Sequence, residues 1–191
     1  MRIFTAFPIE EEARRELYAG YGRVRKDLDA VKWVAEENLH ITLIFFGEMT
    51  KEELDRLLGA LEAYPHDPEH PEPKDPRLSR FTVEYRGVEC FPPRGKPKVI
   101  YSRITAGTER CIEVWSRITG ILGGRGGVKP YIPHITLGRI KAKGFYPRPG
   151  SYEEISGGIE VSSFGVFESK LTPDGPVYRP VQSYPLGDKT V

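Results

Sequence analysis

The tetrapeptide His-Ile-Thr-Leu occurs twice in this chain, at residues 40–43 and again at residues 134–137. Both copies are surrounded by apolar and β-branched residues, which predicts a β-strand for each. Alternate side chains of a strand share a face, so the histidine and threonine of a copy point one way and its isoleucine and leucine the other. Each copy therefore combines an apolar face with a face that carries one imidazole and one hydroxyl.

The elements around the two copies follow a similar order in both halves of the chain. Runs of β-branched and aromatic residues predict strands at residues 2–7, 31–34, 39–46, 78–84, 98–105, 134–140, 159–168 and 177–183. Apolar residues spaced three and four apart predict helices at residues 9–21, after Thr50, and at residues 109–122. Loops are predicted for the proline-rich residues 65–76, the glycine-rich residues 123–127 and the segment between residues 140 and 159.

This order of elements predicts an α+β fold, in which mostly antiparallel sheets are backed by helices and the two halves are structurally related. Thr50 and Glu53 have the spacing of a capping box, which places the start of the middle helix. Neither half is large enough to fold comfortably alone, so residues 1–191 are expected to form a single domain.

The composition excludes some partners and favours a cytoplasmic protein. Its formal net charge of +1 is far from the basic balance of proteins that coat duplexes, so no duplex DNA partner is expected. No run of about 18 apolar residues occurs, so no membrane span is expected. Cys90 and Cys111 are not spaced like a metal pair and are interpreted as reduced core residues.

The polar faces of the two copies suit phosphodiester chemistry. If the halves face each other, His40, Thr42, His134 and Thr136 converge on one site. A histidine titrates near pH ~6.5, so one ring can be neutral and accept a proton while the other is charged and donates one. Threonine hydroxyls can donate hydrogen bonds to phosphate oxygens, where negative charge accumulates.

Two simpler interpretations compete with this one. A single histidine on a strand is more often a structural hydrogen-bonding residue than a catalyst, and it is the match between two copies that favours catalysis. A metal site is disfavoured, because zinc usually needs three or four ligands and neither copy offers a second ligand within two residues on its face. The remaining histidines, His66 and His70, lie in the proline-rich loop and are interpreted as solvated.

Cations for a phosphate group are less clearly predicted. By strict alternation Arg139 lies on the face opposite Thr136, whereas a bulge at Gly138 would turn it toward the histidines; the sequence leaves both possibilities open. Arg94, Lys96 and Lys98 form a basic stretch that is interpreted as a solvated loop.

Aromatic residues near the two copies could stack on the bases of a nucleotide ligand. Tyr131, which precedes His134 by three residues, and Phe46, which alternation places on the face of His40, are the stacking candidates. Trp33, Trp115 and Phe45 are interpreted as core residues.

These residues together resemble the two-histidine (2H) phosphoesterases, in particular the RNA 2′,3′-cyclic phosphodiesterases, which are also called 2′-5′ RNA ligases. The resemblance is carried by residues 2–8, 37–47, 96–101, 131–139 and 169–178, and so spans nearly the whole chain. It implies a bilobal fold: two pseudo-symmetric antiparallel-sheet lobes with a central cleft, one His-x-Thr motif per lobe, and no required metal or cofactor.

The resemblance also implies roles for the motif residues. His40 would protonate the departing 3′ oxygen, His134 would activate water by accepting its proton, and Thr42 and Thr136 would bind the phosphate. The substrate would be an RNA end, such as that of a tRNA half, whose 2′,3′-cyclic phosphate is opened to a 2′-phosphate. Without the resemblance, the chemistry allows either order of the two histidines. The sequence leaves the oligomeric state open, with a monomer expected.

Three alternatives share the same site: 2′-5′ joining of RNA as the main role, a small-nucleotide phosphodiesterase, and a module that binds RNA ends or nucleotides without chemistry. The chain also departs from the family in its two long loops and at Gly138, where alanine is more usual.

Overall fold

A computed structural model of the chain describes residues 1–62, 79–92, 96–123, 131–141, 150–173 and 175–187. Its strands are β1 (Arg2–Pro8), β2 (Val31–Trp33), β3 (His40–Glu48), β4 (Phe81–Phe91), β5 (Val99–Ala106), β6 (His134–Ile140), β7 (Ser151–Val161), β8 (Ser163–Thr172) and β9 (Gly175–Pro185). Its helices are α1 (Glu11–Gly20), α2 (Gly22–Asp27), the short 3-10 helix η1 (Glu36–Asn38), α3 (Lys51–Glu62) and α4 (Thr108–Ile121). The predicted loops 65–76 and 123–127 lie wholly or largely outside these residues.

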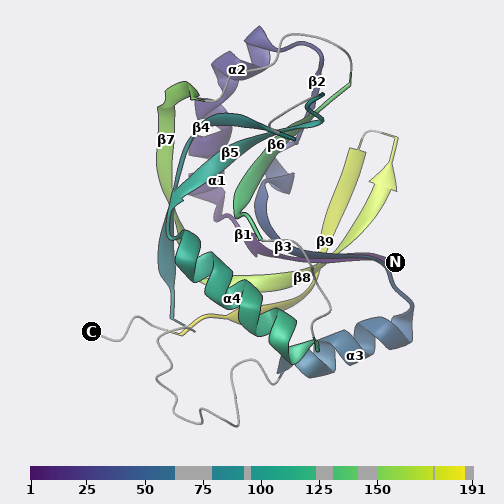
Figure 1. Ribbon diagram of the computed structural model, residues 1–191. Helices are drawn as coiled ribbons and strands as arrows, with labels where there is room; N and C mark the ends of the chain where they lie inside the picture. Colours follow the sequence, from purple (N-terminus) through teal and green to yellow (C-terminus); the bar gives the residue numbers. More distant parts are fainter. Residues whose placement is uncertain (63–78, 93–95, 124–130, 142–149, 174, 188–191) are drawn as a thin grey trace.

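The strands form two antiparallel lobes that meet at the two motif strands. The sheet has the order β7-β4-β5-β6-β3-β1-β8-β9, and β2 pairs with β6. Thus β6, β5, β4 and β7 make one lobe, while β3, β1, β8 and β9 make the other, in the same order outward from the centre (Figure 1). The lobes are joined in the sheet through one register pair, Ile41 with Ile135. The α+β fold with two pseudo-symmetric lobes is confirmed.

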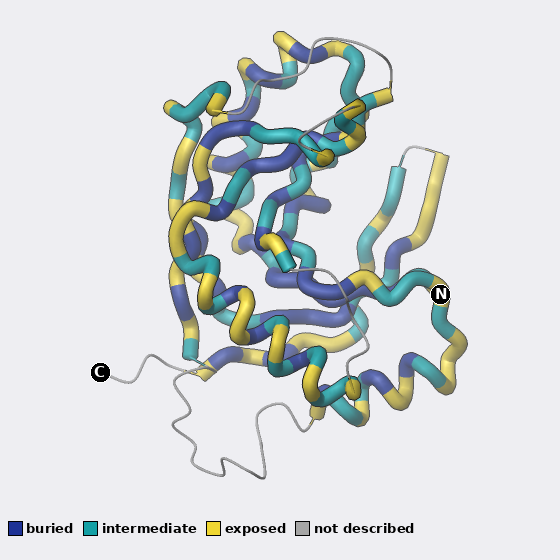
Figure 2. Tube along the Cα trace, viewed as in Figure 1, coloured by how far each residue is buried: buried dark blue, intermediate teal, exposed yellow. Residues whose placement is uncertain are grey.

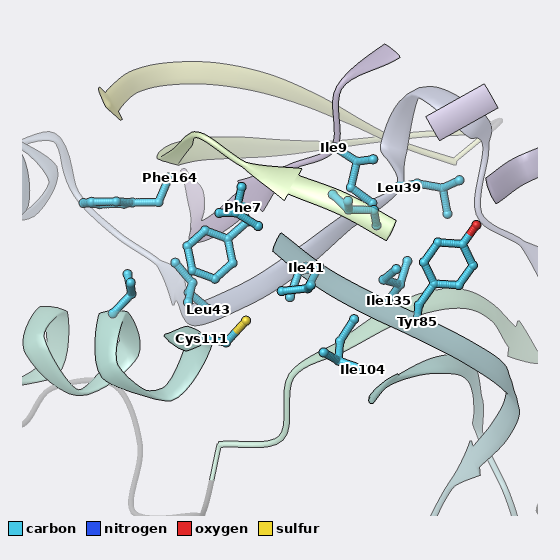
Figure 3. Close-up of a cluster of buried hydrophobic side chains, with 14 of the residues drawn as sticks. Phe7, Ile9, Leu39, Ile41, Leu43, Tyr85, Ile104, Cys111, Ile135 and Phe164 are labelled. Atoms are coloured by element: carbon cyan, nitrogen blue, oxygen red, sulfur yellow. The ribbon is translucent and has the colours of Figure 1, made fainter. Parts of the chain in front are cut away.

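Two helices link the lobes: α1 packs on the sheet of the other lobe, and α4 contacts one strand of each lobe. Helix α1 follows β1 but contacts β7, where Gly20 approaches Ile155. Helix α4 follows β5 and contacts both β5 and β3, and its Cys111 lies near Leu43 in the core (Figure 3). Because the helices cross over in this way, the apolar core is continuous between the lobes.

The core lies between the sheet and these helices. Ile41 and Ile135, which no solvent reaches, lie at its centre (Figure 3). The buried stretches run along β1, β3 and β8 (Figure 2). The capping box at the start of α3 is confirmed: the Thr50 N–H donates to Glu53 Oε2 (2.8 Å), and the Glu53 N–H donates to Thr50 Oγ1 (3.2 Å).

Two predictions about strands are wrong. Residues 151–158 were expected to be a loop, but they belong to β7, and the strand expected at 159–168 is divided between β7 and β8. Gly157, one of the glycines that suggested a loop, serves packing instead: a Cβ at this position would lie 2.5 Å from the Tyr85 hydroxyl oxygen. A glycine in a strand often marks such a close approach.

Helix α2 was not predicted, and within the described ranges no helix is both long and apolar enough to cross a membrane.

Candidate active site

The two motifs lie on adjacent strands with their polar residues on one face of the sheet. Ile41 and Ile135 pair in antiparallel register and are buried in the core. In such a register His40 lies opposite Thr136, and Thr42 lies opposite His134, on the reverse face. These four side chains, all partly buried, define what is called here the histidine face. The predicted convergence of the two motifs is therefore present in the backbone pairing.

Each motif strand has an irregularity directly after its threonine. In β3, Ala6 pairs with Thr42 but Thr5 pairs with Ile44, so Leu43 is an extra residue. In β6, Tyr101 pairs with Thr136 but Ile100 pairs with Gly138, so Leu137 is the extra residue.

An extra residue reverses the alternation beyond it. Phe45 and Arg139, which occupy equivalent positions after the two bulges, are consequently turned to the histidine face.

The bulge resolves the position of Arg139. Gly138 faces the core side, where a Cβ would lie 2.5 Å from Val31 Cγ1, and Arg139 is exposed on the other side. The charge of Arg139 also acts on the Tyr178 hydroxyl by lowering its pKa, although burial raises that pKa overall. Tyr178 in turn contacts the His40 ring, with centroids 5.3 Å apart. Arg139 therefore lies on the same face as His40.

The same reversal corrects two expectations in β3. Phe45 was interpreted as a core residue, but its side chain is 55% exposed and lies under the guanidinium of Arg2. Phe46 was expected to share the face of His40, but it packs against the hydrophobic core. Both errors have one cause: alternation was extrapolated through Leu43, the bulged residue.

The ring of His40 is held by backbone, hydroxyl and aromatic contacts. Its Nδ1 lies 2.7 Å from the carbonyl oxygen of Asn38, and its Nε2 lies 2.9 Å from Thr42 Oγ1. Phe4 and Tyr178 flank the ring, with centroids at 5.1 and 5.3 Å. A carbonyl can only accept, so Nδ1 carries the proton in the neutral ring, and the Thr42 hydroxyl donates to Nε2.

His134 is held in a parallel way. Its Nδ1 donates to the carbonyl of Ile132 at 2.8 Å, and Phe91 and Tyr101 flank it with centroids at 5.3 and 5.4 Å. In the neutral ring Nε2 is therefore an unprotonated acceptor. Both imidazoles thus have Nδ1 committed to the backbone and Nε2 left for chemistry.

Burial favours the neutral form of both rings. It lowers the pKa of His40 to about 4, with a further lowering from the nearby charge of His134 and an opposing effect from the hydrogen bond to Asn38. It also lowers the pKa of His134, against the hydrogen bond to Ile132. Without a ligand, both Nε2 atoms are therefore unprotonated at neutral pH.

Tyr131 connects the two motifs. Its hydroxyl donates to the carbonyl oxygen of Thr42 at 3.0 Å, and its ring stacks on Trp115 of α4 with centroids 5.6 Å apart. Burial raises its pKa well above the usual range, so the hydroxyl stays a donor. The hydroxyl and one face of the ring are used within the protein, and stacking of Tyr131 on an RNA base stays a prediction.

The sequence interpretation missed most of the residues around the histidines. Arg103 pairs with His134 across the strands and forms ion pairs with Glu89 (2.6 Å) and Glu153 (3.5 Å). Tyr101 donates to the other oxygen of Glu89 at 2.6 Å. Strand alternation could have placed Tyr101 and Arg103 on one face, but only the β5–β6 register puts them beside His134.

Among the described residues, no group of three or more His, Cys, Asp or Glu side chains could hold a metal ion. Cys90 and Cys111 are free thiols, and burial raises the pKa of both.

An α+β fold of two antiparallel lobes, with one His-x-Thr unit on the inner strand of each, defines a two-histidine phosphoesterase. The chain belongs to the family described as LigT like Phosphoesterase, whose sequence model matches residues 7–101 and 108–178.

Its relatives include two proteins named RNA 2′,3′-cyclic phosphodiesterase. That of Thermus thermophilus is 34% identical over 97% of this chain and 90% of its own length. That of Archaeoglobus fulgidus is 30% identical over 96% of this chain and 99% of its own. The crystal structure of the T. thermophilus protein TT0787 matches the whole of both chains with a TM-score of 0.73 and 29% identity. Escherichia coli LigT, at 23% identity and a TM-score of 0.71 over 98% of both chains, shares the fold.

Proposed function

We propose that this chain is an RNA 2′,3′-cyclic phosphodiesterase that opens a terminal cyclic phosphate to a 2′-phosphate, with no metal, within the single domain 1–191. The observation that carries the proposal is the register of β3 and β6, which sets His40 opposite Thr136 and Thr42 opposite His134. The name shared by the relatives in T. thermophilus and A. fulgidus supports the choice of substrate.

In the proposed reaction the two histidines act on opposite sides of one phosphorus atom. Nε2 of His134 takes a proton from water, and the water oxygen bonds to phosphorus. The bond from phosphorus to the 3′ oxygen breaks, and His40 gives its Nε2 proton to that oxygen. Because Nδ1 of His40 already holds a proton for Asn38, this ring must enter the reaction as the imidazolium.

The phosphate itself supplies the reason for His40 to be charged. A negative charge near the ring raises its pKa from the low value that burial imposes. Once Nε2 is protonated, the Thr42 hydroxyl no longer donates to it and is released to a phosphate oxygen. Thr136 binds a second oxygen, and Arg139, on the same face, offsets the developing charge.

The test is turnover of an oligonucleotide with a 2′,3′-cyclic phosphate in excess chelator. We expect product with a 2′-phosphate from the wild type, and a loss of about 10²–10⁴-fold for His40→Ala and for His134→Ala, the usual contribution of a general acid or base. His70→Ala, outside the described residues, is the matched control and should retain full activity. Tight binding without product would favour a binding module instead. Turnover that survives loss of both histidines would remove the proposal.

A further inference from the structure

Positive side chains continue along the histidine face beyond the two motifs. Lys32 of β2 pairs directly with Arg139 of β6, and both are exposed. Val31, Trp33 and Ile140, their neighbours in sequence, all pack against the hydrophobic core. Since adjacent residues of a strand point to opposite faces, Lys32 and Arg139 lie side by side on the face away from the core.

Lys141 is the next outward position after Arg139. Ile140 between them packs against the core, and the Lys141 N–H donates to the Ala30 carbonyl at 2.9 Å, which continues the pairing with β2. Lys141 is exposed. Two residues of a strand span about 6.6 Å, comparable with the distance between successive phosphates of an extended single strand. Along β6 and the residue that follows it, the histidine face therefore carries Thr136, then Arg139, then Lys141.

The β8–β9 hairpin places these cations near the proposed reaction centre. A Cβ on Gly175, at the turn of the hairpin, would lie 3.8 Å from Nζ of Lys32. Tyr178 of the same hairpin contacts the ring of His40, and the charge of Arg139 lowers the pKa of its hydroxyl against the larger effect of burial. The cations and His40 thus border the same hairpin.

The charges of these cations are not neutralised locally. Within the part of the chain that the structure describes, the side chains of Lys32, Arg139 and Lys141 form no ion pair or hydrogen bond. Arg103, which also lies beside a motif histidine, is instead held between two carboxylates, those of Glu89 and Glu153. A polyanion is therefore attracted to the β2–β6 side of the site.

We propose that Lys32 and Lys141, with Arg139 between them, bind the phosphodiesters that precede the terminal cyclic phosphate of a single-stranded RNA. The proposal rests on the proposed function and names its substrate class: an oligonucleotide is preferred to a cyclic mononucleotide. The RNA strand is expected to run from the two histidines along β6 toward Lys141. Each bound phosphate releases counterions, so the preference weakens as salt is added.

The experiment compares kcat/KM for 2′,3′-cyclic AMP and for a short single-stranded oligonucleotide that ends in a 2′,3′-cyclic phosphate, at several KCl concentrations. For Lys32→Ala and for Lys141→Ala we expect the ratio of oligonucleotide to mononucleotide kcat/KM to fall about three- to ten-fold, the size of an exposed charge contact. The slope of log kcat/KM against log salt for the oligonucleotide should become shallower by about 0.7 for each lost phosphate contact. Lys51→Ala, an exposed lysine at the start of α3, is the matched control.

The two proposals fail in different ways. A wild type that turns over neither substrate removes the proposed function and with it this inference. If the wild type turns over both substrates, the proposed function stands, and the double variant Lys32→Ala/Lys141→Ala decides this inference. The inference is overturned if that variant has the same oligonucleotide-to-mononucleotide ratio of kcat/KM and the same salt slope as the wild type.

Discussion

At the scale of single residues, the proton on each histidine is placed by a backbone carbonyl. Asn38 and Ile132 accept from the two Nδ1 atoms at 2.7 and 2.8 Å, which leaves both Nε2 atoms to the reaction. The two rings differ in their second contact: Nε2 of His40 meets the Thr42 hydroxyl at 2.9 Å. To donate a proton from Nε2, the His40 ring must carry protons on both nitrogens and so be an imidazolium. Because burial keeps the free ring neutral, this charged form has to be induced by the bound substrate.

This requirement predicts a ligand-dependent titration of His40. In the free protein, NMR should show the imidazole of His40 with a pKa of about 4, because burial penalises the charged form. Saturating inorganic phosphate should raise that pKa, because the anion stabilises the imidazolium. Without ligand, the ring therefore stays neutral as the pH falls from 7 until it approaches 4. A His40 that titrates near 6.5 both with and without phosphate would contradict this environment.

Residue-scale features of the site were predictable only where alternation holds. The shared face of His40 with Thr42, and of His134 with Thr136, follows from the strand period within each motif. The orientations of Phe45, Phe46 and Arg139 do not follow, because they lie beyond a bulge. A bulge is a property of two paired strands: Gly138 suggested one in β6, but no residue of β3 indicated the bulge at Leu43.

At the scale of elements, β3 and β6 share one register pair and need a second link. The bond from the Tyr131 hydroxyl to the Thr42 carbonyl joins the segment before β6 to β3. Thr5 has a related role at the bulge, where its hydroxyl accepts the Ile44 N–H at 3.2 Å. The Tyr131 bond helps to set the spacing between the motifs, and the Thr5 bond holds β1 to β3 at the bulge.

Tyr131→Phe should therefore lower kcat with little change in KM, because it loosens the spacing of the histidines without removing a substrate contact. It should also reduce the free energy of unfolding by about 1 kcal/mol, the value of a typical hydrogen bond. Tyr184→Phe is the matched control: its hydroxyl donates to the Leu58 carbonyl at 3.4 Å, away from the motifs. Equal effects of the two variants on kcat would show that Tyr131 has no special role.

Gly138→Ala should separate β2 from β6. The added Cβ would lie 2.5 Å from Val31 Cγ1 and 3.1 Å from the Lys32 carbonyl oxygen. Overpacking of this kind costs about 1–3 kcal/mol, measurable by urea denaturation. Adding Val31→Ala removes the closer contact and should recover part of the loss. A single variant as stable as the wild type would contradict the close packing of the two strands.

Prediction of elements failed where glycines serve packing rather than turns. Gly157 and Gly158 made residues 151–158 look like a loop, whereas Gly157 allows β7 to pass the ring of Tyr85. Helix α4 was predicted nearly to its ends, because its apolar spacing is regular and glycines follow it. A regular apolar spacing can be recognised in the sequence, whereas a contact with a side chain far along the chain cannot.

At the scale of the whole molecule, the lobes are joined by more than the sheet. Helix α1 follows β1 but packs on β7 of the other lobe, and α4 contacts both β5 and β3, one strand of each lobe, so helices are exchanged between the lobes. The sequence indicated two related halves, but it carried no sign of this exchange, because each helix has an ordinary apolar face whichever sheet it covers. The exchange holds the motif strands together at the centre.

The exchange predicts that the lobes unfold as one unit. Trp33 reports on the lobe of β6 and Trp115 on α4, and they are the two tryptophans of the chain. In the variants Trp115→Phe and Trp33→Phe, each of which keeps one reporter, the urea midpoint of tryptophan fluorescence should coincide with the midpoint of circular dichroism. If tryptophan fluorescence and circular dichroism had separate urea midpoints in either variant, the lobes would unfold independently.

The central claim is that two imidazoles from distant parts of the chain share one phosphate. A crystal structure with inorganic phosphate tests this most directly. The account predicts one phosphate on the histidine face, with Nε2 of His40 and Nε2 of His134 each about 2.6–3.2 Å from its oxygens. A phosphate bound to one ring while the other lies out of reach would contradict it.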